Sequence, residues 1–313
     1  MSEAVLPVAR KLVGGIRYGD RALAWLSGFA VIVILAMLAV IVVDIAQGGM
    51  QTLSWSFLSE APREGMTAGG IFPAIFGTVA TTLLMTIAAV PAGVATAIYL
   101  SEYAPPQSRI ARLIQVCVAN LAGVPSIVFG LFGLGFFISA VGRTIDRTFY
   151  HGESVYGRGC LLWSSLTLSI LTLPVVVVAT EEAILAVPRE LREGSLALGA
   201  TRLQTILRVV LPEALGGILT GTILAVSRGA GEVAPILFTG VAYYLPYLPT
   251  HLNDQFMNLG YHVYVLATQS PDVERTKPLL YGTALVLLLL TFLLNVVAIS
   301  IRSRQRKGSR ASV

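Results

Sequence analysis

The chain has 313 residues, of which 55% are hydrophobic and only 12% are charged, and its mean hydropathy is +0.76. Soluble domains carry roughly 25% charged residues, so this composition excludes an ordinary soluble domain and favours a membrane protein with several spans. The net charge of +5 does not indicate nucleic-acid binding, because Lys and Arg flank apolar runs and form no basic stripe interleaved with aromatic residues.

The first predicted span is residues 22–43, an uncharged run that follows a basic segment at residues 1–21. At 1.5 Å per residue this run covers the ~30 Å hydrocarbon core of a bilayer. It exceeds the apolar core of a signal peptide, which has ~7–15 residues, so we expect a retained helix. Residues 45–70 are rich in Gly and Ser and are expected to form an external loop.

Three further apolar runs follow, at residues 71–100, 113–141 and 159–182. The first of these contains Pro73 and Pro91, which are tolerated inside membrane helices because neighbouring groups satisfy the carbonyls that proline leaves free. The run at 113–141 contains several glycines, which let helices approach closely in lipid. We therefore expect it to be an inner helix of a bundle.

The last two predicted helices cover residues 214–238 and 279–301. The loop between them, residues 239–278, is too apolar and aromatic for a free linker, so we expect part of it to pack on the bundle or on a partner. Residues 302–313 form a basic tail that we expect to be disordered. The sequence thus predicts an all-α integral membrane protein with six transmembrane helices.

An even number of spans places both termini on the same side of the membrane. That side carries 15 of the 22 Lys and Arg residues, the opposite loops carry 6, and Arg228 lies within a predicted span. The positive-inside rule therefore places both termini and the segment 189–212 in the cytoplasm. The sequence thus predicts a multi-pass protein of the cytoplasmic membrane. The loop between the third and fourth spans, with three arginines, is a mild exception.

The segment 189–212 carries the most specific motif, with Glu193, Gly199 and then Leu211-Pro212 at fixed offsets. A short helix that carries Glu193 must bend before the next helix, and Gly199 allows the positive φ that such a bend requires. An ordinary amphipathic helix at the membrane surface is the alternative interpretation. The spacing closely resembles the EAA signature of ABC importer permeases, which reads E-A-A, three residues, G, nine residues, I, one residue and L-P.

Three positions depart from that pattern, since Gly194 and Ser195 replace two alanines and Val209 replaces isoleucine. Each exchange keeps the small or apolar character of the position. The resemblance implies a type I (MetI-like) importer bundle, with residues 71–301 as its transmembrane domain. It also implies a cytoplasmic coupling helix that docks in a groove of a separate ATPase and depends on four residues: Glu193, Gly199, Leu211 and Pro212.

Other segments resemble the phosphate-specific branch of these permeases, and its A-type subunit in particular. They are YLSEYAP at 99–105, GVPSIVFGLFGL at 123–134, the stretch 171–202, and RGAGEVAPILFTG at 228–240. The resemblance implies that the chain forms half of a translocation pathway for inorganic phosphate. It implies as partners a second permease subunit, two copies of a cytoplasmic ATPase, and an external phosphate-binding protein.

Two charged residues, Arg228 and Glu232, lie within the predicted fifth helix. An arginine in mid-membrane costs about 2.5–3.5 kcal/mol on insertion scales, so its presence requires a reason. The i,i+4 spacing puts Glu232 on the same helix face, one turn further on. The pair could merely neutralise itself and fix the helix in the bundle. We favour a place in the substrate pathway, because a guanidinium binds phosphate with paired donors.

Enzymatic and metal-dependent functions find little support in the sequence. Cys117 and Cys160 lie far apart and the three histidines lack ligand spacing, so we expect no metal and no cofactor. No GxxxxGK[ST] sequence occurs, so ATP would be hydrolysed by another chain. An importer for another oxyanion or small solute remains the alternative within the family. An ion-coupled secondary transporter is the alternative outside it, although no inverted repeat is evident.

Overall fold

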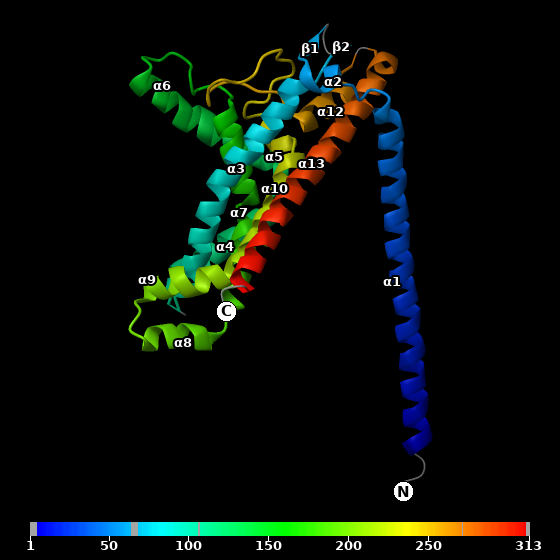
Figure 1. Ribbon diagram of the computed structural model, residues 1–313, viewed down its shortest axis with the longest axis vertical. Helices are drawn as coiled ribbons and strands as arrows, with labels where there is room; N and C mark the ends of the chain where they lie inside the picture. Colours follow the sequence, from blue (N-terminus) through cyan, green and yellow to red (C-terminus); the bar gives the residue numbers. More distant parts are fainter. Residues whose placement is uncertain (1–4, 64–67, 106, 271, 311–313) are drawn as a thin grey trace.

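The computed structural model describes residues 5–63, 68–105, 107–270 and 272–310. Within these residues six helices are long and apolar enough to cross a membrane, which confirms the expected all-α membrane fold (Figure 1). The helices and strands are α1 (Val5–Met50), α2 (Trp55–Ser59), β1 (Pro62–Arg63), β2 (Ala68–Gly69), α3 (Phe72–Ile98), α4 (Arg109–Gly123), α5 (Ser126–Phe132), α6 (Arg143–Phe149), α7 (Leu161–Leu185), α8 (Arg189–Ala197), α9 (Arg202–Thr205), α10 (Leu211–Gly231), α11 (Ala234–Leu237), α12 (Leu259–Thr268) and α13 (Val273–Arg310). Three π-helical turns, η2 (Tyr99–Tyr103), η3 (Gly133–Gly142) and η4 (Ile206–Val210), join some of them.

Helices α3, α7 and α10 pack at the centre of the bundle. Small residues permit this, because a Cβ added at Gly217 of α10 would lie 2.3 Å from the Cβ of Ala183 in α7. At Gly221, one turn further along α10, it would lie 2.6 Å from the Cβ of Ala179. Helices that associate in lipid gain mainly from such close backbone approach, since lipid tails are as apolar as leucine.

Buried hydroxyl groups in this centre bond to backbone carbonyls. Thr81 donates to the carbonyl of Gly77 at 2.6 Å, and Thr172 donates to that of Leu168 at 2.9 Å, each four residues back along its own helix. Ser169 of α7 also donates across to the carbonyl of Met85 in α3, at 3.0 Å. A polar group away from water must find such a partner, so these bonds allow serine and threonine in an apolar interior.

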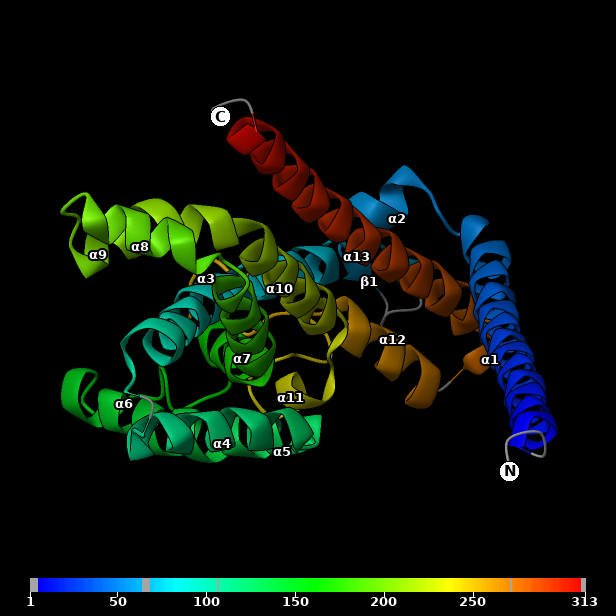
Figure 2. The ribbon, with the colours of Figure 1, turned by 90° about the horizontal axis from the view of Figure 1, so that it is seen from below.

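The third span differs from the expected helix 113–141. The chain breaks at Val124 and Pro125 into α4 and α5, which lie nearly in line (Figure 2), and it continues through η3 into α6. Proline disfavours helical backbone at the preceding residue, and Val124 is extended, with φ −76° and ψ 132°. The prediction of one continuous helix over residues 113–141 is therefore wrong.

The fifth helix also differs from the expected range 214–238, because α10 ends at Gly231 and Glu232 is extended. Two glycines, Gly229 and Gly231, weaken the helix there, since glycine loses the most backbone entropy on ordering. Pro235 then begins the short helix α11 and cannot donate an amide hydrogen bond back along a continuing helix. The fifth span is therefore a broken helix.

The terminal helices are longer than expected. α1 runs well past residues 22–43 in both directions, and α13 continues through the basic tail to Arg310, so the expected disorder of residues 302–310 is wrong. α1 stands apart from the bundle along most of its length (Figure 1), and its apolar side chains are exposed in this chain. It meets α13 near one end, where Tyr281 donates to the carboxylate of Asp44 at 3.0 Å.

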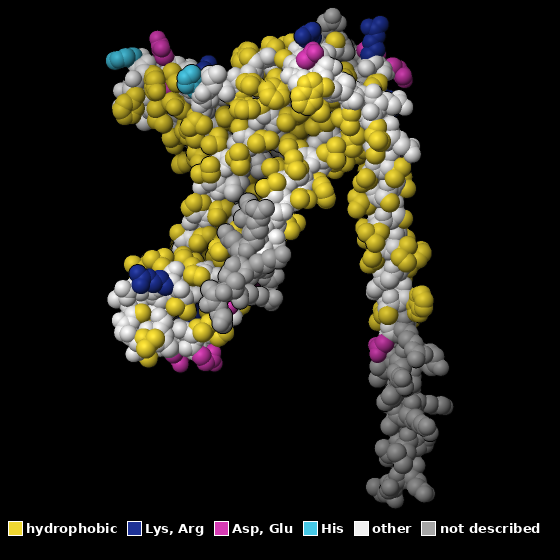
Figure 3. All heavy atoms as spheres, viewed as in Figure 1, with side chains coloured by type: hydrophobic (Ala, Val, Ile, Leu, Met, Phe, Trp, Pro, Cys, Tyr) yellow, Lys and Arg dark blue, Asp and Glu magenta, His cyan; other side chains and the backbone are white. Residues whose placement is uncertain are grey.

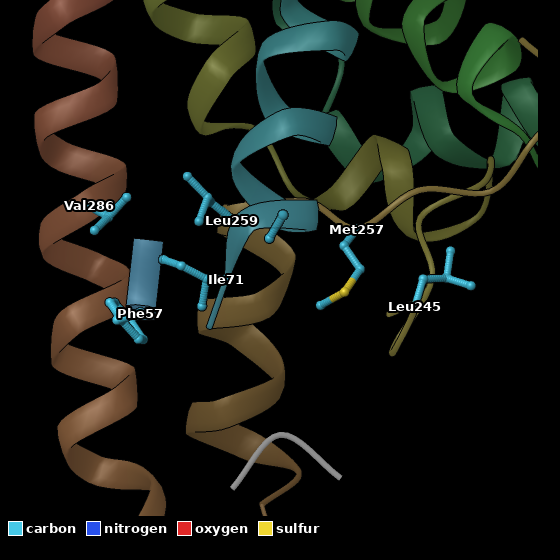
Figure 4. Packing of buried hydrophobic residues seen from close by; sticks show 7 residues of the cluster. Phe57, Ile71, Leu245, Met257, Leu259 and Val286 are labelled. Atoms are coloured by element: carbon cyan, nitrogen blue, oxygen red, sulfur yellow. The ribbon is translucent and has the colours of Figure 1, made fainter. Parts of the chain in front are cut away.

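At the end of the bundle opposite α8 and α9, a compact cap covers the helices. β1 and β2 pair antiparallel there, and a hydrophobic cluster joins the loops to α3 and α13 (Figure 4). The buried members of this cluster are Phe57, Ile71, Ala74, Leu245, Met257, Leu259 and Val286. Leu259 also donates its amide hydrogen to the hydroxyl of Thr78 in α3, at 2.9 Å. Part of the loop 239–278 thus packs on the bundle.

Candidate functional site

Within the segment 189–212, residues 189–205 form a bent elbow at one end of the bundle. α8 ends in a turn at Gly199, which has a φ of +86°, a left-handed conformation that glycine adopts without strain. The turn is closed by hydrogen bonds from the amide of Gly199 to the carbonyl of Leu196, at 3.0 Å, and from that of Ala200 to Ser195, at 3.2 Å. The chain is thereby reversed towards the bundle within a few residues.

The second arm of the elbow begins with a capping box at Thr201. The Thr201 hydroxyl accepts from the amide of Gln204 at 3.3 Å, and the Gln204 side chain accepts from the amide of Thr201 at 2.8 Å. From Arg202 the chain is helical to Gly231, through α9, η4 and α10. Pro212 lies in the first turn of α10, directly after the π-helical turn, which is where the helix accommodates a residue without an amide hydrogen.

The outer face of the elbow is exposed and carries both charged and apolar side chains. Glu193 is exposed on α8, and Leu198 at the tip of the turn is 91% exposed. The other exposed apolar side chains of this surface are Leu191, Leu196 and Leu203. An exposed apolar group rimmed by polar residues is typical of a surface that binds another protein.

The inner face of the elbow is fixed to the bundle by a residue to which the sequence analysis gave no role. Glu102, in η2, lies within the segment 99–105 that contributed to the family resemblance. Its carboxylate is 2.5 Å from the guanidinium of Arg192 in α8. No sequence spacing predicts this contact, because the two residues lie 90 positions apart.

Arg228 and Glu232 form an ion pair at the end of α10. The Arg228 Nε lies 3.4 Å from Glu232 Oε1, and the two side chains are 42% and 20% exposed in this chain. Glu232 is the extended residue that follows the helix, so the expectation that it continues the same helical face is corrected. Arg228 also lies in the last turn of α10, where its positive charge interacts favourably with the partial negative charge of the carbonyls at the helix C-terminus.

The depth of this ion pair in the bundle follows from its neighbour Gly229. A Cβ at Gly229 would lie 2.2 Å from the sulfur of Met85, the central residue of α3. It would also approach Thr172, close to the centre of α7, at 3.7 Å. Arg228 thus lies halfway along the two central helices. It is separated from Pro212 by ~24 Å, at 1.5 Å per helical residue.

The residue before Arg228 connects α10 to the last helix. The Ser227 hydroxyl donates to the side-chain carbonyl of Asn295 in α13. Leu224, one turn before Arg228, is exposed. α10 is thus connected to α13 through Ser227, while the side chains of Leu224 and Arg228 remain exposed in this chain. Among the described residues, no group of three or more His, Cys, Asp or Glu side chains could hold a metal ion.

Comparison with known proteins gives consistent results. Residues 89–308 match the family described as "Binding-protein-dependent transport system inner membrane component". The chain is 31% identical over 284 residues to the "Probable phosphate transport system permease protein PstA" of Methanocaldococcus jannaschii, covering 91% of this chain and 93% of the relative. It is 35% identical over 237 residues to "Phosphate transport system permease protein PstA 1" of Mycobacterium tuberculosis (strain ATCC 25618 / H37Rv), covering 75% and 70%.

Solved structures show the same fold at low sequence identity. A chain of a bacterial alginate ABC transporter, solved with an alginate-bound periplasmic protein, aligns with a TM-score of 0.62 at 17% identity, over 94% of this chain and 96% of that one. A chain of the MetNI methionine ABC transporter aligns with a TM-score of 0.56 at 18% identity, over 74% and 94%. On the family match and the long alignments, the chain belongs to the inner membrane components of binding-protein-dependent transport systems.

Proposed function

We propose that this protein is the membrane permease subunit of an ATP-driven importer of inorganic phosphate, the A-type of two permease subunits that together enclose the pathway. The observation that carries the proposal is the half-exposed Arg228 at the end of a broken helix, midway through the bundle. The names of the relatives, which are phosphate transport permeases, support phosphate as the substrate.

Arg228 supplies the recognition chemistry. A guanidinium offers several N–H donors in a plane, which match the oxygens of phosphate and favour a bidentate contact. Glu232 holds the guanidinium at a long distance of 3.4 Å, so an incoming anion can displace the carboxylate. Phosphate and Glu232 then compete for the same guanidinium, and the carboxylate restores the pair once phosphate has left.

A purely structural role for this ion pair has weak support. Both residues belong to one segment, four positions apart, so their contact does not join α10 to another helix. Ser227 and Asn295 make that connection instead. An arginine that only stabilised the fold would avoid the mid-membrane cost better by facing a partner on a neighbouring helix.

The elbow couples this site to ATP hydrolysis in a separate subunit. Its outer face, with Glu193 and Leu198 exposed and the turn fixed at Gly199, docks on one copy of a cytoplasmic ATPase. Leu211 and Pro212 begin α10, and the last turn of α10 carries Arg228. Movement of the ATPase therefore reaches the phosphate site along one helix. The second permease docks on a second copy of the ATPase.

The remaining surfaces fit a multi-pass protein of the cytoplasmic membrane. The N-terminal end of α1 and the C-terminal end of α13 point to the same end of the bundle as α8 and α9 (Figure 1), which supports a cytoplasmic location for both of these ends and for the elbow. Apolar side chains cover residues 23–43 of α1 and the middle of the bundle, while charged side chains lie towards the two ends (Figure 3). The opposite, capped end receives the phosphate-binding protein.

The test is uptake by the complex of this chain, the second permease, the ATPase and the binding protein in liposomes. Radiolabelled phosphate should accumulate only when ATP and the binding protein are present, and excess sulfate should leave the rate unchanged. Full competition by sulfate would indicate an importer for another oxyanion. Uptake by this chain without the ATPase, driven by an ion gradient, would indicate a secondary transporter and would contradict the proposal.

A further inference from the structure

We infer that Glu102 is a positioning residue that transmits movement of α8 to the two central helices, through its ion pair with Arg192. The inference rests on the proposed function, because it concerns how the elbow passes on the movement of an ATPase. Glu102 lies in η2, which continues α3 without a break, so a displacement of its side chain acts on the end of α3. The route is additional to the one that runs through α10.

Arg192 connects α8 to both central helices at once. One terminal nitrogen, Nη1, lies 2.5 Å from the Glu102 carboxylate, and the other, Nη2, donates to the carbonyl of Ile184 near the end of α7, also at 2.5 Å. α3 and α7 are the most extensively packed helices of the bundle centre. Arg192 thereby contacts the ends of α7 and of the helix that continues α3, and Arg228 lies at the level of the midpoints of these two helices.

The ion pair is sheltered from water, with Arg192 20% exposed and Glu102 10% exposed. Removing one partner would leave a charge in a place where water cannot easily solvate it. The Nε of Arg192 is also buried, and it has no hydrogen-bond partner among the residues that the structure describes. Arg192 therefore depends on Glu102 for most of its compensation, and the two side chains must move together.

The second arm of the elbow also contacts Glu102. Arg202 of α9 donates from its guanidinium to the backbone carbonyl of Glu102, and its guanidinium carbon lies 5.2 Å from the ring centre of Tyr103. The two arms are joined to each other by the hydroxyls of Ser195 and Thr205, at 3.0 Å. The elbow thus holds η2 from both sides as one stiff unit.

α8 consequently has two faces with different partners. Arg192 points towards the bundle and Ser195 towards the second arm of the elbow, as their contacts show, while Glu193 and Leu196 are exposed. A force applied to the outer face by a bound protein passes to α3 and α7 through the inner face. Loss of the Glu102 charge should leave the outer face unchanged and weaken only this transmission.

The test uses the complete reconstituted complex with Glu102→Gln, which removes the charge and preserves the size of the side chain. We expect the ATPase to co-purify and to hydrolyse ATP, while the phosphate transported per ATP falls by about tenfold, within the usual range of a coupling free energy. Glu182→Gln is the matched control, because Glu182 is exposed near the same end of α7. It should leave the ratio unchanged.

A second variant separates transmission from folding. Arg192→Lys keeps the positive charge but cannot bridge the Glu102 carboxylate and the Ile184 carbonyl in the same fork geometry, so its transport-to-hydrolysis ratio should fall between wild type and Glu102→Gln. The exchanged pair Glu102→Arg with Arg192→Glu should recover part of the ratio. Loss of ATPase binding in all variants, without recovery in the exchanged pair, would overturn the inference in favour of a purely structural contact.

A readout that does not depend on the solute distinguishes this inference from the proposed function. Spin labels at Arg189 at the start of α8 and at Leu83 on α3, both exposed, report the distance between them. Nucleotide binding should change this distance in the wild-type complex, and the change should be lost with Glu102→Gln. An unaltered change in the variant would refute the role of Glu102. Absence of phosphate uptake by the wild-type complex would instead refute the proposed substrate.

Discussion

The elbow at residues 189–205 and the end of α10 at residues 228–233 are built in opposite ways. In the elbow, a capping box closes the second arm, a glycine turn closes the first, and a sheltered ion pair at 2.5 Å joins the first arm to the bundle. At the end of α10, two glycines lie between the two charged residues, the helix is followed by an extended residue, and the ion pair is long, at 3.4 Å.

This difference matches the roles that we propose for the two regions. A segment that receives a force must not deform, or the movement is absorbed before it reaches the membrane. A segment that binds and releases an anion must change its contacts at low cost, and loosely held elements have low free energies of local opening. α10 connects the two regions, so a rigid elbow and a more easily rearranged ion-pair site are joined by one helix.

The largest effect is expected from Gly199→Val, which should distort the turn of the elbow. A left-handed backbone costs an L-residue about 1–2 kcal/mol, and a β-branched side chain is among the least tolerated there. We expect the protein to insert normally but to lose co-purification with the ATPase.

The matched control is Gly194→Ala on α8, where an added Cβ meets no described atom within 4 Å. It should retain binding and stabilise the helix by about 0.5–1 kcal/mol, because alanine is the better helix former. Equal binding by the Gly199→Val and wild-type proteins would show that the shape of the turn does not matter.

Low pH should destabilise α12, the helix that supports the end of α10. α12 packs against the break in α10, since a Cβ at Gly260 would lie 2.8 Å from Val233. His262 of α12 is buried, and this burial lowers its pKa from 6.5 to about 4. Between these values the unfolded segment binds a proton that the folded one does not. Stability should therefore fall as the pH falls from 6.5 to 4, by up to about 3 kcal/mol.

The measurement is the melting temperature of the protein in detergent or nanodiscs across this pH range. His262→Leu should remove this contribution to the pH dependence, although it also changes the packing of the site. His251→Leu is the control, because His251 lies on an exposed loop. A pH profile of His262→Leu that matches wild type would rule out His262 as the source of acid sensitivity.

A smaller effect is expected from Asn295→Leu, which removes the contact that holds α10 to α13. Hydrogen bonds between membrane helices average about 0.6 kcal/mol and reach about 1.7, so the protein should remain folded. The freed end of α10 should become more mobile, which a spin label at Leu224 would report as a narrower spectrum. An unchanged label mobility would mean that Ser227 and Asn295 do not restrain this end.

The sequence predicts some of these features well and others poorly. Apolar runs fix the number of spans, and the offsets of Glu193, Gly199 and Pro212 locate the elbow, because both depend on local spacing. The breaks at Val124 and after Gly231 were missed, since proline and glycine are tolerated within membrane helices and only the surrounding packing decides whether a helix continues. The pairing of Glu102 with Arg192 is a tertiary contact without a local signal.

The most direct test of the central claim is made with Arg228→Ala, measuring phosphate uptake and ATP hydrolysis in the same proteoliposomes. Leu224→Ala, on the exposed face one turn earlier, is the control and should transport normally. We predict that the Arg228→Ala complex assembles and hydrolyses ATP but moves no phosphate. The elbow that docks on the ATPase is unchanged in this variant, whereas the guanidinium that binds phosphate is missing. Uptake by this complex at the wild-type rate would contradict the account.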